Sequence, residues 1–199
     1  MLHSMTTPEE LASTIGARVR STRIARAWTL DALAESSGIS RRMLVNIEHG
    51  TANPSLATLL RLSDALGVGL PALVEGPRTD TVSVTPAGTG SVLWTGEAGG
   101  TGTLVAGTGP PDVVELWDWT LGPGDAHTSE AHAAGTTELL HVISGHLRLT
   151  VGSESFDLSP GDAARFPGDV PHRYANADEH PCRFALTVFE PDVGTGSHP

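Results

Sequence analysis

Arg42 and Asn46 lie four residues apart in a segment where Leu44 and Ile47 have helical spacing. Residues four apart share one face of a helix, so both polar side chains should point away from the buried leucine and isoleucine. An arginine can form a bidentate pair with guanine, and an asparagine can form one with adenine, in the major groove of DNA. With Arg41 at the start of the segment, they are candidate base-reading residues. The alternative is a solvated helix face.

Three hydroxyl residues, Thr29, Ser40 and Ser55, stand where helices should begin. A hydroxyl at such a position accepts a hydrogen bond from the first turn, and the same end of the helix can bind a phosphate. Capping without phosphate binding is the alternative. Three arginines of the preceding segment could add phosphate contacts: Arg18, Arg20 and Arg23. For Arg20 and Arg23, an ion pair with Asp31 or Glu35 is an equal alternative.

The elements that must position these residues are helices. Apolar residues recur with helical period through the first third of the chain, and glycines stand where helices should end. We expect five helices, at residues 9–27, 30–36, 41–49, 56–66 and 70–74.

The second and third of these helices have the pattern of a helix-turn-helix. That motif needs a small residue where its helices cross, a glycine at the turn and apolar residues inside the second helix. These positions are filled by Ala34, Gly38, Leu44 and Ile47. The segment 15–73 resembles the xenobiotic-response-element (XRE) class of phage-repressor-like DNA-binding domains. The resemblance implies a structural role for Glu48 and a dimer on two operator half-sites about one helical turn apart.

The net charge of −11 would ordinarily argue against DNA binding, but it is unevenly distributed. Residues 1–78 hold 8 Arg and 7 acidic residues, a net charge of +1, whereas residues 79–199 hold 4 Arg and 16 acidic residues, a net charge of −12. The chain contains no lysine, which excludes Schiff-base chemistry. The charge distribution therefore favours a DNA-binding part joined to an acidic part.

The remainder of the chain alternates apolar and polar residues with the period of β-strands, as in residues 113–119 and 147–151. Val82 and Val84 show the same alternation. The segment 88–109 contains 8 glycines, so we expect loops there with short strands at most. The predicted domains are a helical domain at 1–76, a linker at 77–81 and an all-β domain at 82–199.

The all-β domain resembles the cupin superfamily over residues 113–188. Its first motif is carried by His132, Ala134, Glu138 and Gly145, with Ala134 where a second histidine is usual. Its second motif is carried by Gly161, Pro167, His172 and Asn176, with Asp169 where a glycine is usual. The resemblance implies a jelly-roll β-barrel behind the helix-turn-helix domain.

A cupin metal site normally takes three imidazoles and one carboxylate, of which the resemblance leaves His132, Glu138 and His172. These could hold Zn, Fe, Mn or Ni with open coordination positions. Two alternatives stay open, because the three side chains could hydrogen-bond an organic ligand or water, or could be vestigial. Trp117 and Tyr174 could fill the core or line an effector cavity. The remaining histidines expected at surfaces or turns are His127, His146 and His180.

The two resemblances together are similar to one-component transcription regulators, in which a small effector binds a cupin domain and changes operator affinity. The alternative is a mononuclear non-heme iron enzyme of the epoxidase or dioxygenase type, since some proteins with this domain order are phosphonate epoxidases. Ala134 and the absence of lysine argue against the enzyme. The lone Cys182 excludes an intrachain disulfide framework, and no apolar run is long enough for a membrane helix. We expect a cytoplasmic homodimer that binds double-stranded DNA and a small effector.

Overall fold

The computed structural model describes residues 7–75 and 82–195. It divides the chain into two compact units, one containing the helices and the other nearly all of the β structure. The predicted linker at 77–81 lies outside the described residues, so the predicted domain limits stay predictions. Within the described parts of the chain, no helix is long and apolar enough to cross a membrane.

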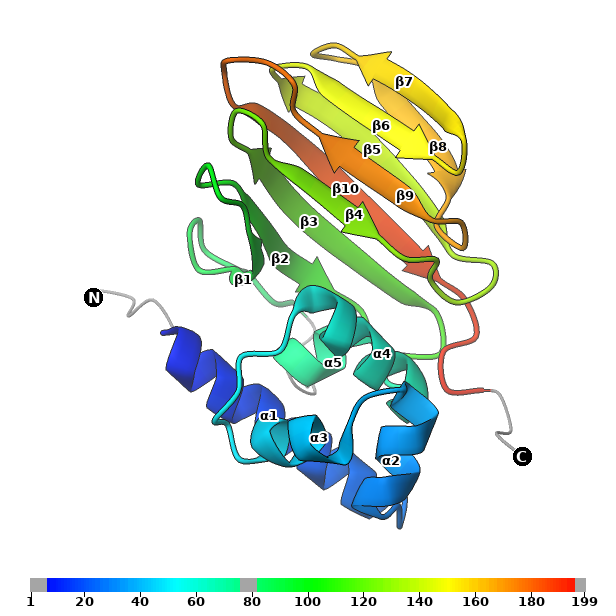
Figure 1. Cartoon of the computed structure of the whole chain (residues 1–199). Helices are drawn as coiled ribbons and strands as arrows, with labels where there is room; N and C mark the ends of the chain where they lie inside the picture. Colours follow the sequence, from blue (N-terminus) through cyan, green and yellow to red (C-terminus); the bar gives the residue numbers. More distant parts are fainter. Residues whose placement is uncertain (1–6, 76–81, 196–199) are drawn as a thin grey trace. The chain divides into compact units, whose positions relative to one another are not determined.

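The helical unit contains the five predicted helices, with ends that differ from the prediction by at most two residues (Figure 1). Each of the first four begins after a side chain that accepts a hydrogen bond from its first turn. Gly38, in the left-handed conformation at φ 64°, ends α2 and makes the turn to α3. The helices are α1 (Pro8–Ala25), α2 (Leu30–Ser37), α3 (Arg41–Glu48), α4 (Leu56–Leu66) and α5 (Leu70–Val74).

The core of the helical unit positions α3. Leu44 and Ile47 of α3 are 0% and 1% exposed, and Val19 of α1 and Leu33 of α2 are buried as well. Gly16 lets α1 approach α3 closely, because a Cβ at that position would lie 2.1 Å from the carbonyl oxygen of Ile47. The buried face of α3 is thus fixed, and its opposite face is free to contact a ligand.

The β unit consists of two antiparallel sheets (Figure 1). The larger has the strand order β1-β2-β3-β10-β5-β8 and the smaller β4-β9-β6-β7. The strands are β1 (Ser91–Thr95), β2 (Thr101–Gly107), β3 (Val113–Leu121), β4 (Ala126–Ser129), β5 (Thr137–Ser144), β6 (Leu147–Val151), β7 (Glu154–Leu158), β8 (Ala163–Pro167), β9 (His172–Ala175) and β10 (Cys182–Glu190).

The core of the β unit lies between the inner faces of the two sheets. Strands β3, β5 and β10 alternate buried with more exposed residues, so each presents one side chain in two to this core. The all-β prediction is confirmed, but the predicted barrel is not: no strand pair joins the two sheets among the described residues.

One strand prediction is wrong, and a second is too cautious. Val82 and Val84 lie outside the described strands and are 77% and 78% exposed, because a period-two pattern forms a strand only where another strand pairs with it. The glycine-rich segment 88–109, where the sequence predicts short strands at most, contains the five-residue β1, which includes the alternating Val92 and Trp94, and the longer, seven-residue β2. A Cβ at Gly102 of β2 would lie 2.6 Å from the ring of Trp119, so this glycine makes room for a tryptophan.

Candidate functional site

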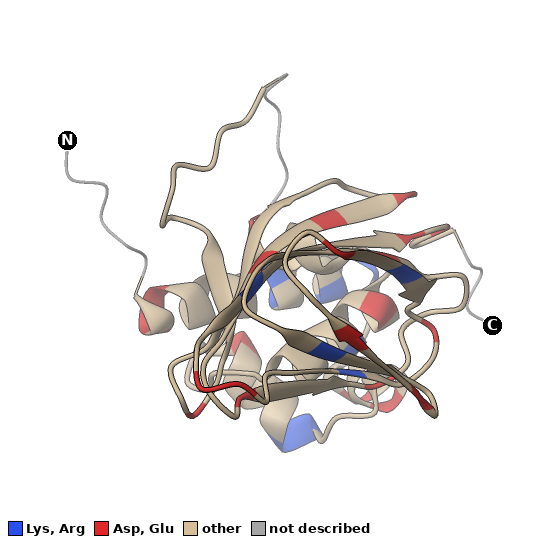
Figure 2. Ribbon diagram, turned by 90° about the horizontal axis from the view of Figure 1, so that it is seen from above, with Lys and Arg blue, Asp and Glu red and all other residues tan. Residues whose placement is uncertain are grey.

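The outer face of α3 carries the three side chains predicted to read bases. Arg41, Arg42 and Asn46 are all exposed, and Leu44 and Ile47 are buried on the opposite side. Arg41 forms an ion pair with Asp31 at 2.9 Å, with side-chain exposures of 62% and 77%. An ion pair this exposed is weak and can exchange for a DNA contact. In Figure 2, arginines recur on the helices, and acidic residues are spread over the β unit.

The three hydroxyls predicted at helix starts are all caps. Thr29 accepts from the amide of Ala32 at 3.1 Å, and Ser40 accepts from the amide of Met43 at 3.2 Å. Ser55 accepts from the amide of Thr58 at 3.3 Å. Capping uses one acceptor of each hydroxyl and leaves further amides of the first turn for a phosphate.

Arg23 and Arg18, two of the predicted phosphate contacts, have structural partners instead. Arg23 makes a bidentate ion pair with Glu48, its Nε and Nη2 donating to the carboxylate at 2.6 and 2.8 Å. Its Nη1 donates to the carbonyl of Trp28 at 2.8 Å. Arg18 donates to the carbonyls of Leu73 and Val74. Because their donors are used inside the domain, we leave both arginines out of the proposed DNA surface; the structural role expected for Glu48 fits this pair.

In the β unit, His132, Glu138 and His172 come together between the two sheets. Glu138 lies on β5 of the larger sheet, His172 on β9 of the smaller one, and His132 in the β4–β5 loop. The Nε2 atoms of both histidines lie 3.2 Å from Oε1 of Glu138. The potential ligand atoms of all three residues lie within 4.8 Å of one another. Ala134, at the position of the missing second histidine, is exposed in the same loop.

The donor set of this cluster fits a divalent metal. Nδ1 of His172 lies 2.8 Å from the carbonyl oxygen of Val170. When Nδ1 donates its hydrogen to this carbonyl, the neutral ring has no hydrogen on Nε2, so the lone pair of Nε2 faces the carboxylate of Glu138. Oε1 of Glu138 is buried with no hydrogen-bond partner of acceptable geometry among the described residues. Two imidazole nitrogens and one orphaned carboxylate oxygen are the ligands that Zn, Fe, Mn and Ni accept.

The electrostatics of the cluster keep Glu138 ionised. Burial alone would raise the pKa of this carboxyl group, but His132, His172 and the Tyr174 hydroxyl lower it to about 2. The hydroxyl of Tyr174 donates to Oε2, which places this predicted effector residue in the cluster. Burial and the neighbouring carboxylate raise the pKa of Tyr174 well above its ordinary value, so the hydroxyl stays a donor.

Trp117, the other predicted effector residue, is not in this cluster. It lies on β3, is 3% exposed, and its Nε1 donates to Oε2 of Glu115 at 2.9 Å. The strand register places β10 between β3 and β5, so Trp117 is two strands away from Glu138. The donor of Trp117 is used in the core.

His127, predicted at a surface or turn, is half-buried, and its ring packs against interior aromatic rings. Its ring lies 4.9 Å from Trp119, 5.6 Å from Trp94 and 6.3 Å from Tyr174, centroid to centroid. Burial, followed by the charge of His172, lowers the pKa of His127 to about 4. No local pattern could predict this group of rings, because its members come from four strands. His146, by contrast, is exposed, as predicted.

The lowered pKa of His127 should make the β unit sensitive to acid. Between pH 6.5 and 4 the unfolded chain binds a proton that the folded state excludes, so stability falls as the pH falls through this window. The loss attributable to His127 should be about 3 kcal/mol at most. Urea unfolding, followed by tryptophan fluorescence from pH 8 to 4.5, should show a smaller loss for His127→Phe than for the native chain. Equal losses would contradict the prediction.

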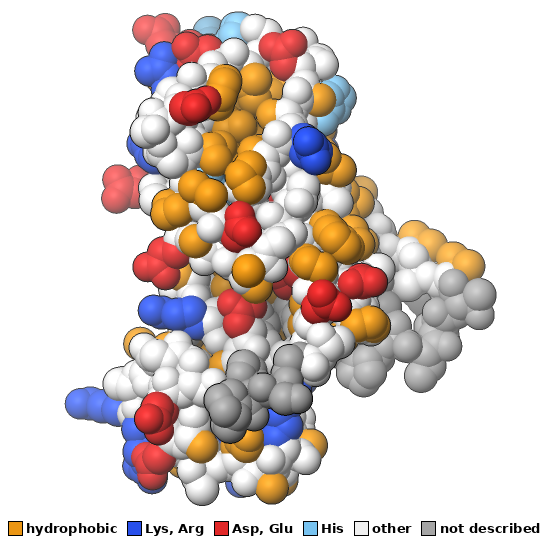
Figure 3. All heavy atoms as spheres, turned by 90° about the vertical axis from the view of Figure 1, so that its right-hand side faces the viewer, with side chains coloured by type: hydrophobic (Ala, Val, Ile, Leu, Met, Phe, Trp, Pro, Cys, Tyr) orange, Lys and Arg blue, Asp and Glu red, His pale blue; other side chains and the backbone are white. Residues whose placement is uncertain are grey.

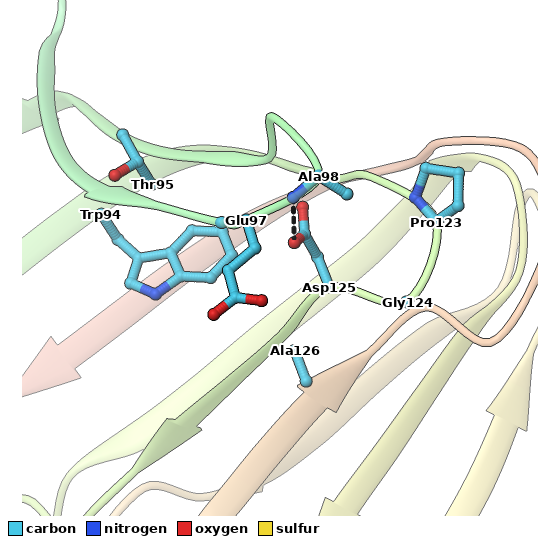
Figure 4. A pocket seen from close by; sticks show the side chains of 9 residues that line it. Trp94, Thr95, Glu97, Ala98, Pro123, Gly124, Asp125 and Ala126 are labelled. Carbon is cyan, nitrogen blue, oxygen red and sulfur yellow. Dashed lines mark hydrogen bonds between the residues drawn. The ribbon is translucent and has the colours of Figure 1, made fainter.

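A separate hollow of about 580 Å³ lies beside the turns that join β1 to β2 and β3 to β4 (Figure 4). Its lining includes Trp94 and Glu97 but no member of the histidine–glutamate cluster. Asp125, which the sequence analysis missed, holds these turns together by accepting hydrogen bonds from the amides of Ala98, Gly100 and Gly122, each at 2.9 Å. Asp125 is therefore a structural carboxylate.

Comparison with known proteins covers both units of the chain. A helix-turn-helix family model matches residues 19–73, and a cupin domain model matches residues 117–189. The HTH-type transcriptional regulator SutR of Escherichia coli K12 is 30% identical over 184 residues, which cover 92% of this chain and 98% of SutR. This chain belongs to the family of XRE-type helix-turn-helix transcriptional regulators with a cupin domain.

Two further relatives have the same organisation or part of it. The HTH-type transcriptional regulator PuuR of E. coli K12 is 23% identical over 150 residues, covering 75% of this regulator and 80% of PuuR. The crystal structure of an HTH_3 family transcriptional regulator from Vibrio cholerae superimposes with a TM-score of 0.72 at 25% identity, covering 93% of this regulator and 99% of that chain. The V. cholerae chain therefore matches this regulator over almost its whole length.

The residues of both candidate sites lie inside the segments matched by the family models. The helix-turn-helix match contains all of α2 and α3, and the cupin match contains His132, Glu138 and His172. His127 also lies inside the segment matched by the cupin model, but it is not one of the cupin motif residues. The side chains that the sequence analysis missed act through packing and backbone hydrogen bonds rather than through motifs.

Proposed function

We propose that this regulator reads two-fold related operator half-sites as a homodimer, using Arg41, Arg42 and Asn46 of α3. The observation that supports this reading most is the exposed polar face of α3 over a buried Leu44 and Ile47. The first turns capped by Thr29, Ser40 and Ser55 would bind the flanking phosphates. In this proposal residues 1–76 form the reading domain, 77–81 the linker and 82–199 the effector domain of a cytoplasmic protein.

Mobility shift with the full-length chain tests the reading function. The probes are duplexes from upstream of its own gene and of neighbouring genes, with an unrelated duplex of equal length as the control. We expect a preferred duplex whose binding weakens steeply as salt rises, since phosphate contacts release counterions. Equal affinity for all duplexes would argue against sequence-specific reading.

The cupin domain is the proposed effector site. His132, Glu138 and His172 would hold a divalent metal, Zn, Fe, Mn or Ni, and Tyr174 would position the carboxylate through Oε2. A metal with three protein ligands supplies open coordination positions to which oxygen or nitrogen atoms of a small effector can bind. An effector that binds one arrangement of the dimer better than the other changes operator affinity by that difference.

Glu138→Gln should reduce the metal affinity of the full-length chain by about 100-fold. The substitution exchanges a charged ligand for a neutral amide, and the pKa of about 2 shows that the native carboxylate is ionised at any working pH. Titration of the metal-free chain with zinc in competition with a chromogenic chelator measures the change. Glu130→Gln, an exposed neighbour outside the cluster, is the matched control. Unchanged zinc binding would remove the cluster from the proposal.

An iron-dependent enzyme is the second candidate function, because three ligands with open positions also suit iron enzymes that use O₂. The specific observation is again the cluster of His132, Glu138 and His172. Oxygen consumption by the iron-loaded chain with a panel of small phosphonates and hydroxy acids tests it. If the chain turns over a substrate and binds no DNA, the enzyme function would replace the regulator function in this proposal.

A further inference from the structure

The outer face of the six-stranded sheet carries large apolar side chains in the open. Leu116 on β3 is 43% exposed, Leu139 on β5 is 51% exposed, and Phe189 on β10 is 39% exposed. These strands are neighbours in the order β3-β10-β5, and all three residues alternate with buried ones, so they point away from the core. Figure 3 shows hydrophobic side chains at the surface of the β unit between charged ones.

The strand register places Leu116 and Leu139 on either side of Thr187. Thr187 of β10 pairs with Leu116 on one side and with Leu139 on the other, so the three form one row across the sheet. Phe189 lies in the next row of the same face. Three exposed large apolar side chains within two rows of one sheet face, around Thr187, favour an interaction surface.

Polar groups border this patch. In the row beyond Thr187, Asp118 on β3 and His141 on β5 pair with the same residue of β10, Ala185. Asp118 is also ion-paired with Arg183, at 2.8 Å, with side-chain exposures of 39% and 51%. An apolar centre beside a charged rim is the composition of a protein–protein interface.

We propose that this face packs against the same face of a second copy of the chain, with the two-fold axis parallel to β10. The proposal rests on the proposed function, since two-fold operator half-sites require a dimer, and it names the interface of that dimer. A two-fold axis along β10 places Leu116 opposite Leu139 of the second copy, twice over.

Charge complementarity selects this axis. With the axis along β10, Asp118 lies opposite His141 of the second copy, so the carboxylate meets an imidazole. Arg183 lies opposite the same residue of the second copy, with its charge already paired to Asp118 at 2.8 Å. An axis perpendicular to the strands through the Thr187 row would instead place Asp118 opposite Val114 and bury a charged group against an apolar one. The two sheets would pack with nearly aligned strands, as stacked sheets commonly do.

The size of the face suits a stable dimer. Six strands about 4.8 Å apart, with about 3.3 Å between residues, give a footprint of about 700 Å² per copy. The two copies together would bury about 1,400 Å², which is the size of a standard protein–protein interface.

Single charges at the centre of the face test the proposal. In sedimentation equilibrium of the full-length chain without DNA, Leu116→Lys and Leu139→Glu should each raise the dimer dissociation constant at least about 100-fold, because each places two unpaired charges in the interface. Phe156→Glu is the matched control, since Phe156 is 47% exposed on β7 of the other sheet. Circular dichroism spectra like that of the native chain would show that the variants fold.

The double variant Leu116→Lys with Leu139→Glu tests the axis. It brings each new ammonium opposite a new carboxylate of the other copy, so dimerisation should recover to within about 10-fold of the native chain. A native chain that is monomeric, single variants that stay dimeric, or a double variant that fails to recover would each overturn the proposal. A monomer that reads bases would still bind a single half-site in the mobility shift. Failure of the proposed dimer interface can therefore be distinguished from failure of the proposed DNA reading.

Discussion

Replacing Glu48 by alanine should lower the free energy of unfolding of the helical domain by about 3 to 5 kcal/mol. The substitution leaves the guanidinium of Arg23, whose side chain is 12% exposed, without the carboxylate that accepts two of its hydrogen bonds. Removal of one partner from a buried ion pair strands the other charge, which costs far more than the net value of the pair. The effect should exceed that of any exposed ion pair in the chain.

Urea unfolding of the full-length chain, followed by the helical circular dichroism signal, measures this loss. Glu35→Ala, an exposed acid on α2, is the matched control and should change stability by less than about 0.5 kcal/mol. The double variant Arg23→Ala with Glu48→Ala should lose less than the sum of the two single variants, because it leaves no unpaired charge. A loss below about 1 kcal/mol for Glu48→Ala would mean that the pair is solvated.

The helices were predictable because their signals are local. A capping hydroxyl and the helix that it begins are adjacent in the sequence, so Ser40 and Gly38 define the turn into α3 without any tertiary information. Strands lack such signals. Gly102 reads as a loop residue, yet it belongs to β2 because its missing Cβ makes room for Trp119 across the strand pair.

The same distinction divides the candidate site. The face of α3 follows from helical spacing alone, and the cupin motifs pointed to His132, Glu138 and His172, which the fold brings together. The partner of Arg23 was not predictable, because Glu48 is 25 residues away and several acids were available. The environment of His127 likewise depends on rings from distant strands, and only the folded chain shows it.

Replacing Arg42 by alanine should reduce the affinity of the full-length chain for its preferred duplex by about 100-fold. Arg42 is exposed on the same face of α3 as Asn46. A bidentate pair between arginine and guanine contributes about 1 to 3 kcal/mol of discrimination, and a dimer loses it in both half-sites. The preferred duplex is obtained by selection from a random-sequence library with the native protein.

The affinity that Arg42→Ala loses through a missing base contact must be distinguished from the affinity lost by removing one positive charge. Arg61→Ala removes one exposed arginine from α4 of the same domain, so it should weaken binding to specific and non-specific duplexes alike, by a few-fold at most. Arg42→Ala should instead lower the ratio of specific to non-specific affinity, and a repeated selection should find one base position relaxed in each half-site. If the variant keeps both affinity and base preference, α3 does not read DNA through Arg42. A uniform loss on all duplexes would make Arg42 a phosphate contact and leave Asn46 and Arg41 as the readers.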